Sequence, residues 1–582
     1  MLSSYLQHYN ADAPRLSTGN RLWLGTMMLI GASIRVYYQY DREFTGDEVG
    51  TVLFAQESLS YLLSHYEGWL TMNYYIALEK AFLNVFGPHP YSLGFVSLVA
   101  GIITIPLTAY LALRLTTVRV SLIAAGLVAI NPYLVGYSGT IRSYSLLAAL
   151  SLTVIILFIR WHSRPTLQNG IWLSVACFFV VLCHLNGVYV VAFVTILVAL
   201  RFLSDRTKAH AATIVRTLLL PLLICGLCFG ASHVAIFPHM AAFRLRWVDA
   251  APTSVAYLPH VWAEYFGESY WGVLSLGLLC VGLWSAWRRQ EFVLLLILCP
   301  SVPIVLMSLE GFSHFPWAYG RFLIYSLPLL IIFVSKGLDS VVTWFVPWQG
   351  RVWGVVLLCA VVAATWWPAM ESKFHEKRTM AGSAVKKAAA IIAKHYAPND
   401  VILMTNWFSE MHLPLYLSKE YVIVNIGRFL LGREEPTANE KVFVVSSCSI
   451  RTGVPQYATD GGTVAVYPFR SRMEVLEQIN DDMAECAERE GPGTVDSEIY
   501  RVLCRIGMRL RRAESRRYCE LWKEYGKENA VPWDTALKMK SLFSVRDREA
   551  PRRGRRGGRG GVASKVRSAT VDRQAGGTGT AR

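Results

Sequence analysis

Four short stretches of this chain carry charged or titratable residues where an apolar segment begins or ends. They are "FTGDEVGT" with Asp47 and Glu48, "SGTIRSYSLL" with Arg142 and Tyr144, the break in an apolar run at His184, and "WAYGRFLIY" with Arg321. Arginine forks bind phosphate oxygens, and a carboxylate accepts the proton of an attacking hydroxyl. The set therefore indicates a reaction on a lipid-linked anion, provided that the fold brings the four stretches together.

The elements that must position these residues are membrane helices. The chain of 582 residues is 53% hydrophobic and only 17% charged, with a mean hydropathy of +0.34. This composition is too apolar for an ordinary soluble protein. A helix needs roughly 20 mostly apolar residues to cross the hydrocarbon layer. We expect eleven such spans, at 22–39, 92–113, 119–137, 142–161, 170–183, 187–203, 211–237, 271–286, 291–309, 320–336 and 351–369. The fifth and sixth are short, so they form either two spans or one re-entrant or broken pair.

Lysine and arginine residues collect in alternate loops, which predicts the orientation of the spans. These basic residues lie before the first span, between the second and third spans, and after the fourth, sixth, eighth and tenth spans. Lys336 is the one that follows the tenth span. Residues 1–21 are then a cytoplasmic leader, and the acidic loop 40–91 faces outside. The leader is polar and no small-residue cleavage site follows, so we expect the first span to be retained. All four stretches fall at the outer face, where ionisable groups need a cavity or a partner.

The C-terminal third has a different pattern, typical of a small α/β domain over residues 370–545. We expect a helix at 383–396, strands at 401–405, 421–425, 441–447 and 463–469, and two or three amphipathic helices within 471–527. Outside the cytoplasm, Cys448, Cys486, Cys504 and Cys519 can form two disulfides or stay as buried thiols.

Residues 546–582 form an Arg- and Gly-rich tail that cannot bury a core, so we expect it to be disordered. The tail supplies a large share of the +16 net charge. Such a tract suggests RNA in a cytosolic protein, but outside a membrane its anionic partners are lipid headgroups and acidic glycans. The alternative is a solvated tail with no specific role. We expect membrane lipids and no nucleic acid among the partners.

The sequence resembles the GT-C glycosyltransferases with a protein-mannosyltransferase type of membrane core, most closely the bacterial branch with the aminoarabinose and lipopolysaccharide-core sugar transferases. The resemblance covers roughly residues 20–340. It is carried by "FTGDEVGT", by "WLTMNYYIALEKAFLNVFG" running into "YSLGFVSLVAGIITIPLTAYLALRL", by "NPYLVGYSGTIRSYSLLAALSL" with its Arg-x-Tyr, and by "YGRFLIYSLPLLII".

The resemblance implies transfer of one sugar from a polyprenyl-phosphate donor to an acceptor hydroxyl of a lipid, glycan or protein, with inversion, on the periplasmic or exterior side of the inner membrane. Asp47 matches the catalytic carboxylate and Glu48 its neighbour, and Arg142 and Arg321 match positions that hold the donor phosphate. Many members carry His or Pro residues just ahead of the pair Tyr74 and Tyr75. Their absence here puts the acceptor or metal arrangement in doubt.

The remaining site candidates have two interpretations each. Tyr74 and Tyr75 suit stacking on a sugar, although aromatic belts also place Tyr at interfaces. His184 can donate a hydrogen bond to phosphate or sugar, bind a metal, or be purely structural. Asp47 also suits the N-cap of a helix, and either arginine can reach lipid headgroups instead.

Two other functions fit many spans with cationic residues. A transporter or flippase for lipid-linked sugars is expected to show internal repeats and charges near the bilayer midplane, whereas here the charges cluster at one face. A glycan ligase or polymerase remains a third interpretation. No spacing typical of a metal site appears, so no cofactor is predicted firmly and a divalent metal stays open.

Overall fold

The computed structural model describes most of the membrane region and part of the C-terminal third. The continuous described stretches are 16–39, 58–64, 73–86, 94–204, 208–233, 257–267, 270–298, 320–347, 382–396, 400–404, 422–425, 441–446, 456–459, 462–468 and 472–490, with single positions such as 48 and short pieces between 353 and 371. Asp47, the cysteines at 448, 504 and 519, the side chain of Cys486 and the tail 546–582 lie outside the described residues. Predictions about them stay predictions.

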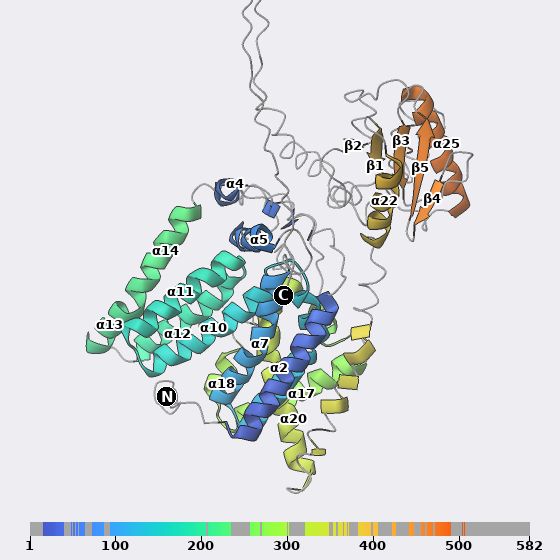
Figure 1. Cartoon of the computed structure of the whole chain (residues 1–582). Helices are drawn as coiled ribbons and strands as arrows, with labels where there is room; N and C mark the ends of the chain where they lie inside the picture. Colours follow the sequence, from blue (N-terminus) through green and yellow to red (C-terminus); the bar gives the residue numbers. More distant parts are fainter. Residues whose placement is uncertain are drawn as a thin grey trace, which may run out of the picture.

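Helices build most of the described part of the first 345 residues, and Figure 1 shows them as two adjoining groups. One group contains α2 (Thr18–Gln39), α7 (Phe95–Leu115), α8 (Val118–Ile130), α9 (Pro132–Ser138), α17 (Tyr270–Arg288), α18 (Phe292–Leu296) and α20 (Leu327–Phe345). The other contains α10 (Tyr144–Ser163), α11 (Leu167–Cys183), α12 (Gly187–Ser204), α13 (Lys208–Ile214), the π-helical turn η1 (Val215–Leu219) and α14 (Leu220–His233). The groups meet where α10 packs on α7.

Four shorter elements complete this region: α4 (Leu59–Ser64), α5 (Asn73–Phe86), α16 (Tyr257–Phe266) and the 3₁₀ segment η4 (Gly320–Ser326). Helix α5 contacts α7 and α11. Segment η4 contacts α10, α16 and α20. These short elements therefore join parts of the bundle that are distant in sequence.

Most of the described residues of the predicted spans are helical, with exceptions such as Asn131 and the residues after α18. By length and composition, four helices in the described residues are able to cross a membrane, Phe95–Leu115, Tyr144–Ser163, Ala211–Gly230 and Gly320–Phe345, or five if the bent pair α8 and α9 counts as one span. The runs 291–309 and 351–369 are described only in part. The total of eleven spans therefore stays a prediction. The short fifth and sixth runs form two separate helices, α11 and α12, which pack on each other.

The third predicted span is broken by 57° between α8 and α9. Pro132 cannot continue the hydrogen-bond ladder of α8, and Asn131 caps α9 by accepting a 3.0 Å bond from the Leu134 amide. The carbonyls left at the end of α8 need donors. The buried guanidinium of Arg35, on α2, donates to the carbonyls of Val128 at 3.0 Å and Ala129 at 2.7 Å. This break turns the chain toward Arg142.

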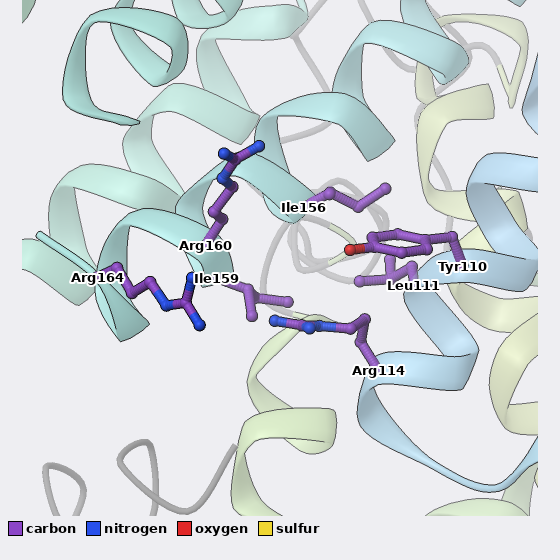
Figure 2. A pocket seen from close by; sticks show the side chains of 7 residues that line it. All are labelled: Tyr110, Leu111, Arg114, Ile156, Ile159, Arg160 and Arg164. Atoms are coloured by element: carbon purple, nitrogen blue, oxygen red, sulfur yellow. The ribbon is translucent and has the colours of Figure 1, made fainter. Parts of the chain in front are cut away.

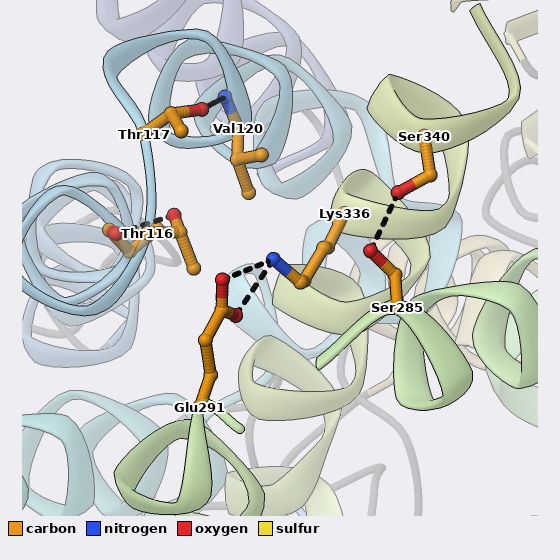
Figure 3. Close-up of polar contacts among 8 residues, drawn as sticks. Thr116, Thr117, Val120, Ser285, Glu291, Lys336 and Ser340 are labelled. Carbon is orange, nitrogen blue, oxygen red and sulfur yellow. Dashed lines mark hydrogen bonds and ion pairs between the residues drawn. The ribbon is translucent and has the colours of Figure 1, made fainter. Parts of the chain in front are cut away.

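Helices α17 and α20 pack closely because glycines face each other. A Cβ on Gly337 would lie 1.9 Å from the Leu278 carbonyl oxygen, and one on Gly282 would lie 2.1 Å from the Phe333 carbonyl oxygen. Small residues at such crossings let helix backbones approach. The Ser340 hydroxyl donates to Ser285 at 3.0 Å across the same pair (Figure 3).

The predicted end of the tenth span at Lys336 is wrong, because the helix continues to Phe345. Lys336 is buried inside α20 and forms an ion pair with Glu291, at 2.9 and 2.7 Å from the two carboxylate oxygens (Figure 3). One turn on, Asp339 pairs with Arg119 at 2.9 Å. These two pairs allow charged residues inside a buried helix. Lys336 is therefore not a loop residue, and it does not count toward the orientation.

The C-terminal part contains a five-stranded mixed sheet in the order β2-β1-β3-β5-β4. Its strands are β1 (Val401–Met404), β2 (Val422–Asn425), β3 (Lys441–Ser446), β4 (Gln456–Thr459) and β5 (Gly462–Pro468). Strand β1 pairs in parallel with β2 and β3, and the other pairs are antiparallel. The expected strands are present, and β4 is additional. The described helices here are α22 (Gly382–His395) and α25 (Arg472–Glu490), and Tyr467 on β5 donates a 2.6 Å bond to Asp482 on α25.

Candidate active site

The turn from Ile141 to Ser143 forms the centre of the candidate site. Helix α10 begins directly after it, at Tyr144. The Ser97 hydroxyl on α7 donates to the carbonyl of Arg142 at 2.7 Å. The thiol of Cys183, at the end of α11, lies 3.5 Å from the Ser143 carbonyl. Three helices therefore hold the backbone that presents Arg142, whose side chain is largely buried.

One member of the predicted acidic pair, Glu48, lies against this turn. Glu48 is fully buried, and its Oε1 atom accepts a 2.6 Å hydrogen bond from the Ile141 amide, 93 residues further along the chain. Hydrogen bonds to an ionised acceptor are short and strong. Glu48 therefore lies against the residue before Arg142. Asp47 precedes Glu48 directly but lies outside the described residues.

His184 joins the same cluster from the turn between α11 and α12. Its ring centroid lies 5.8 Å from that of Tyr144 and 5.5 Å from that of Phe322. Asn186, two residues on, donates from its side chain to the Phe322 carbonyl at 3.1 Å. The turn therefore ties the start of α10 to the segment that carries Arg321.

The electrostatics of His184 link both predicted arginines. Burial, together with the positive charges of Arg142 and Arg321, lowers the pKa of His184 to about 3. The imidazole is therefore neutral at physiological pH. Its Nδ1 accepts the Asn186 amide at 3.2 Å, so Nε2 carries the hydrogen. Within the part of the chain that the structure describes, this buried Nε2 has no hydrogen-bond partner.

Arg321 lies in the 3₁₀ segment η4, not in the α-helix that follows. Its guanidinium carbon is 5.3 Å from the centre of the Phe322 ring. Tyr265, on α16, donates to the Gly320 carbonyl at 2.8 Å. Glycine at position 320 leaves room for Glu264, because a Cβ there would lie 2.1 Å from its Oε2 and the carboxylate would have to move.

Glu264 is a carboxylate that the sequence interpretation missed. It accepts a 3.1 Å hydrogen bond from Tyr133 on α9, and it lies against the residue before Arg321. The available signal was one acidic residue within the apolar helix Tyr257–Phe266. That signal was weak, because nothing in the sequence relates α16 to η4.

A second missed group is the buried carboxyl of Glu79 on α5. Tyr75, one turn earlier, contacts Glu79 Oε1 at 2.6 Å and Ser97 Oγ at 2.7 Å, and Ser97 reaches the Arg142 carbonyl. The two hydroxyl hydrogens cannot fill all three contacts. If Glu79 is ionised, Tyr75 donates to it, Ser97 donates to Arg142, and the contact between the two hydroxyls has no hydrogen. A protonated Glu79 supplies the third hydrogen.

The burial of Glu79 also favours the protonated carboxyl. Desolvation raises the pKa of Glu79 well above its usual range, more than the hydrogen bond from Tyr75 lowers it. The chain of donors then runs from Glu79 to Tyr75, to Ser97 and to the carbonyl of Arg142. We call these residues Glu79, Tyr75 and Ser97 the α5 relay. Tyr75 is 1% exposed and its hydroxyl lies in this relay. Tyr74, also predicted as a sugar contact, is half-buried on α5.

The described residues contain no group of three or more His, Cys, Asp or Glu side chains able to hold a metal ion. Asp47, which the sequence interpretation named as a possible ligand, is not among them. Metal dependence therefore stays open. The described part of the arrangement provides the buried Arg142, the partly buried Arg321 and a neutral imidazole, with Glu48 bonded to the residue before Arg142.

Structural comparison finds similar solved structures. The crystal structure of ArnT from Cupriavidus metallidurans bound to undecaprenyl phosphate matches with a TM-score of 0.53 and 14% identity, over 78% of this chain and 99% of that one. The apo state of the same protein gives 0.53 and 13%, over 77% and 98%. The oligosaccharyltransferase AglB from Archaeoglobus fulgidus gives 0.47 and 12%, over 70% and 65%.

No model of a known protein family matches the sequence, and no curated protein sequence matches it. The match to ArnT shows that the chain has the GT-C fold, as the sequence resemblance predicted. At this level of identity the comparison shows the fold alone, and the site must support the function.

Proposed function

We propose that the chain is a membrane glycosyltransferase that moves one sugar from a polyprenyl-phosphate donor to an acceptor hydroxyl. The observation that carries the proposal is the convergence of Arg142, Arg321 and His184, with Glu48 bonded to the residue before Arg142. Two guanidinium groups in one site suit a phosphate, which they can bind through two oxygens each. The GT-C fold and the undecaprenyl phosphate bound to ArnT support the donor class.

In the proposed reaction the acceptor oxygen attacks the anomeric carbon from the face opposite the phosphate. The new carbon–oxygen bond forms as the bond to the phosphate oxygen breaks, and the configuration inverts. Asp47 takes the hydroxyl proton, which contributes typically 10²- to 10⁴-fold to the rate. The polyprenyl phosphate leaves as an anion that Arg142 and Arg321 stabilise. It needs no strong general acid, because it is already stable when charged.

His184 has a narrower role in this mechanism. The neutral ring cannot compete with the arginines as a cation, but its Nε2–H is a buried donor beside both of them. It donates to a phosphate or sugar oxygen. The polar cluster belongs to the outer face of the inner membrane by the predicted orientation, and the acceptor is a hydroxyl of a lipid, glycan or protein there.

The test is sugar transfer in membranes supplied with a radiolabelled polyprenyl-phosphate sugar. Asp47→Asn should reduce transfer by about 10²- to 10⁴-fold while donor binding persists. Arg142→Gln and Arg321→Gln should weaken donor binding as well. Glu57→Gln, in the same predicted loop, is the matched control and should keep wild-type transfer. Full transfer by Asp47→Asn would refute the assignment of the base.

Transfer that survives in both arginine variants would refute the phosphate site. Movement of the labelled donor between leaflets, without any transfer in the wild type, would replace the enzyme proposal by a flippase.

A further inference from the structure

A second basic site lies at the opposite ends of α7 and α10 from the candidate active site. A pocket of about 240 Å³ opens there between the last turns of the two helices. Its polar lining consists of Tyr110 and Arg114 from α7, and Arg160 and Arg164 from the end of α10, with no carboxylate among the lining residues (Figure 2). Three guanidinium groups at one cavity give it a positive potential that attracts an anion.

The side chains are arranged to receive a ligand. The guanidinium carbon of Arg114 lies 6.0 Å from the centre of the Tyr110 ring, which orients the fork. Figure 2 shows the Tyr110 hydroxyl and the Arg114 guanidinium pointing into the space beside Ile159. Arginines at helix C-termini also complement the helix dipole. That effect accounts for a basic residue at each helix end, but it does not require three of them around a common pocket.

The surface above the pocket is apolar. On α7, Ile103 and Tyr110 are exposed and lie two turns apart, and Arg114 follows one turn later. On α10, Ile156 lines the pocket one turn before Arg160. The apolar face of α7 thus ends in a cation, and that of α10 does too. A molecule with an apolar tail and a phosphate head matches this order.

We propose that this pocket binds the phosphate of an anionic lipid, with the acyl chains along the exposed face of α7. The predicted orientation puts the pocket at the cytoplasmic leaflet. The proposal is independent of the transferase reaction, because it uses none of the residues assigned to it. The same chemistry also suits free phosphate, and the experiment separates the two sources.

The experiment is native mass spectrometry of the full chain titrated with phosphatidylglycerol in a neutral detergent. Each basic residue near a membrane surface contributes about 1 kcal/mol, or about five-fold in affinity. Arg114→Gln should therefore weaken binding about five-fold, and the triple change of Arg114, Arg160 and Arg164 to Gln on the order of 100-fold. Arg114→Lys keeps the charge and tests the fork separately, with an intermediate loss expected.

Arg288→Gln is the matched control, because Arg288 also lies in the last turn of its helix, with its guanidinium carbon 5.3 Å from the Trp284 ring centre. It should bind phosphatidylglycerol like the wild type. Equal losses in Arg114→Gln and Arg288→Gln, or equal binding of phosphatidylcholine, would overturn the proposal. So would unchanged binding in the triple variant.

Inorganic phosphate at millimolar concentration identifies the source. If it does not displace phosphatidylglycerol, the acyl chains contribute and the ligand is a lipid. If it displaces the lipid and is retained itself, the pocket is a site for free phosphate, and the lipid assignment is overturned.

Discussion

The α5 relay makes a prediction that depends on one proton. We expect Glu79→Gln to preserve the relay, because the amide N–H₂ donates to Tyr75 as the protonated carboxyl does. Glu79→Ala removes the first donor and leaves buried groups unpaired, which costs about 1–3 kcal/mol of stability. The two variants therefore differ in outcome although both remove the carboxyl.

The magnitude for Glu79→Gln follows from proton linkage. The folded state raises the pKa of Glu79, whereas the unfolded chain has a glutamate pKa of about 4.3. Between these values the folded state binds more protons, so the stability of the wild type falls as the pH rises. The slope is about 1.4 kcal/mol per pH unit for one group. Glutamine does not titrate, so the Glu79→Gln variant does not lose stability in this way as the pH rises.

The assay is equilibrium unfolding of wild type and Glu79→Gln in detergent at pH 5, 6 and 7. Modification of the buried thiols of Cys177 and Cys183 reports unfolding. The stability of Glu79→Gln relative to wild type should grow steadily as the pH rises from 5 to 7, because the wild type loses stability over this range and glutamine does not. Tyr75→Phe, which breaks the relay without removing Glu79, should lower stability by about 1–3 kcal/mol and reduce sugar transfer. A difference between Glu79→Gln and wild type that is constant with pH would refute the protonated carboxyl.

Three further predictions concern the site and the bundle. Arg142→Lys and Arg321→Lys should each lower kcat/KM for transfer at least about ten-fold, because a point charge replaces the planar fork; wild-type kinetics in either would contradict paired phosphate contacts. The folded pKa of about 3 keeps His184 neutral, so wild-type stability should fall as the pH drops below about 6.5, by up to about 1.4 kcal/mol per unit. In unfolding titrations His184→Asn should lose less stability than the wild type over this pH range. The same dependence of stability on pH in both proteins would refute the neutral His184. Gly337→Ala places a Cβ 1.9 Å from a carbonyl oxygen of α17 and should destabilise the fold, whereas Gly277→Ala, with nothing within 4 Å, should be neutral or stabilising in thermal melts.

Hydrophobic patterning determined much of the helical fold. A span needs only a long apolar run, and a strand only a short β-branched one, so α7, α10 and β3 lie within a few residues of their expected bounds. The strand β4 was missed because "QYAT" carries no such pattern. The end of the tenth span was wrong because Lys336 was taken as a boundary, and sequence alone does not show that Glu291 neutralises it.

The sequence also predicted part of the candidate site, and the rest depended on the tertiary structure. Residue type at the ends of apolar runs was enough to select Glu48, Arg142, His184 and Arg321, because isolated charges at a membrane boundary are rare and need a reason. The sequence therefore determined which groups are available and what class of chemistry they suit. Only the tertiary structure decided which of them meet. Contacts such as that between Glu48 and Ile141 join segments 93 residues apart. The proton on Glu79 depends on burial of the carboxyl and on hydroxyl groups from two helices, and both conditions arise only when the helices pack.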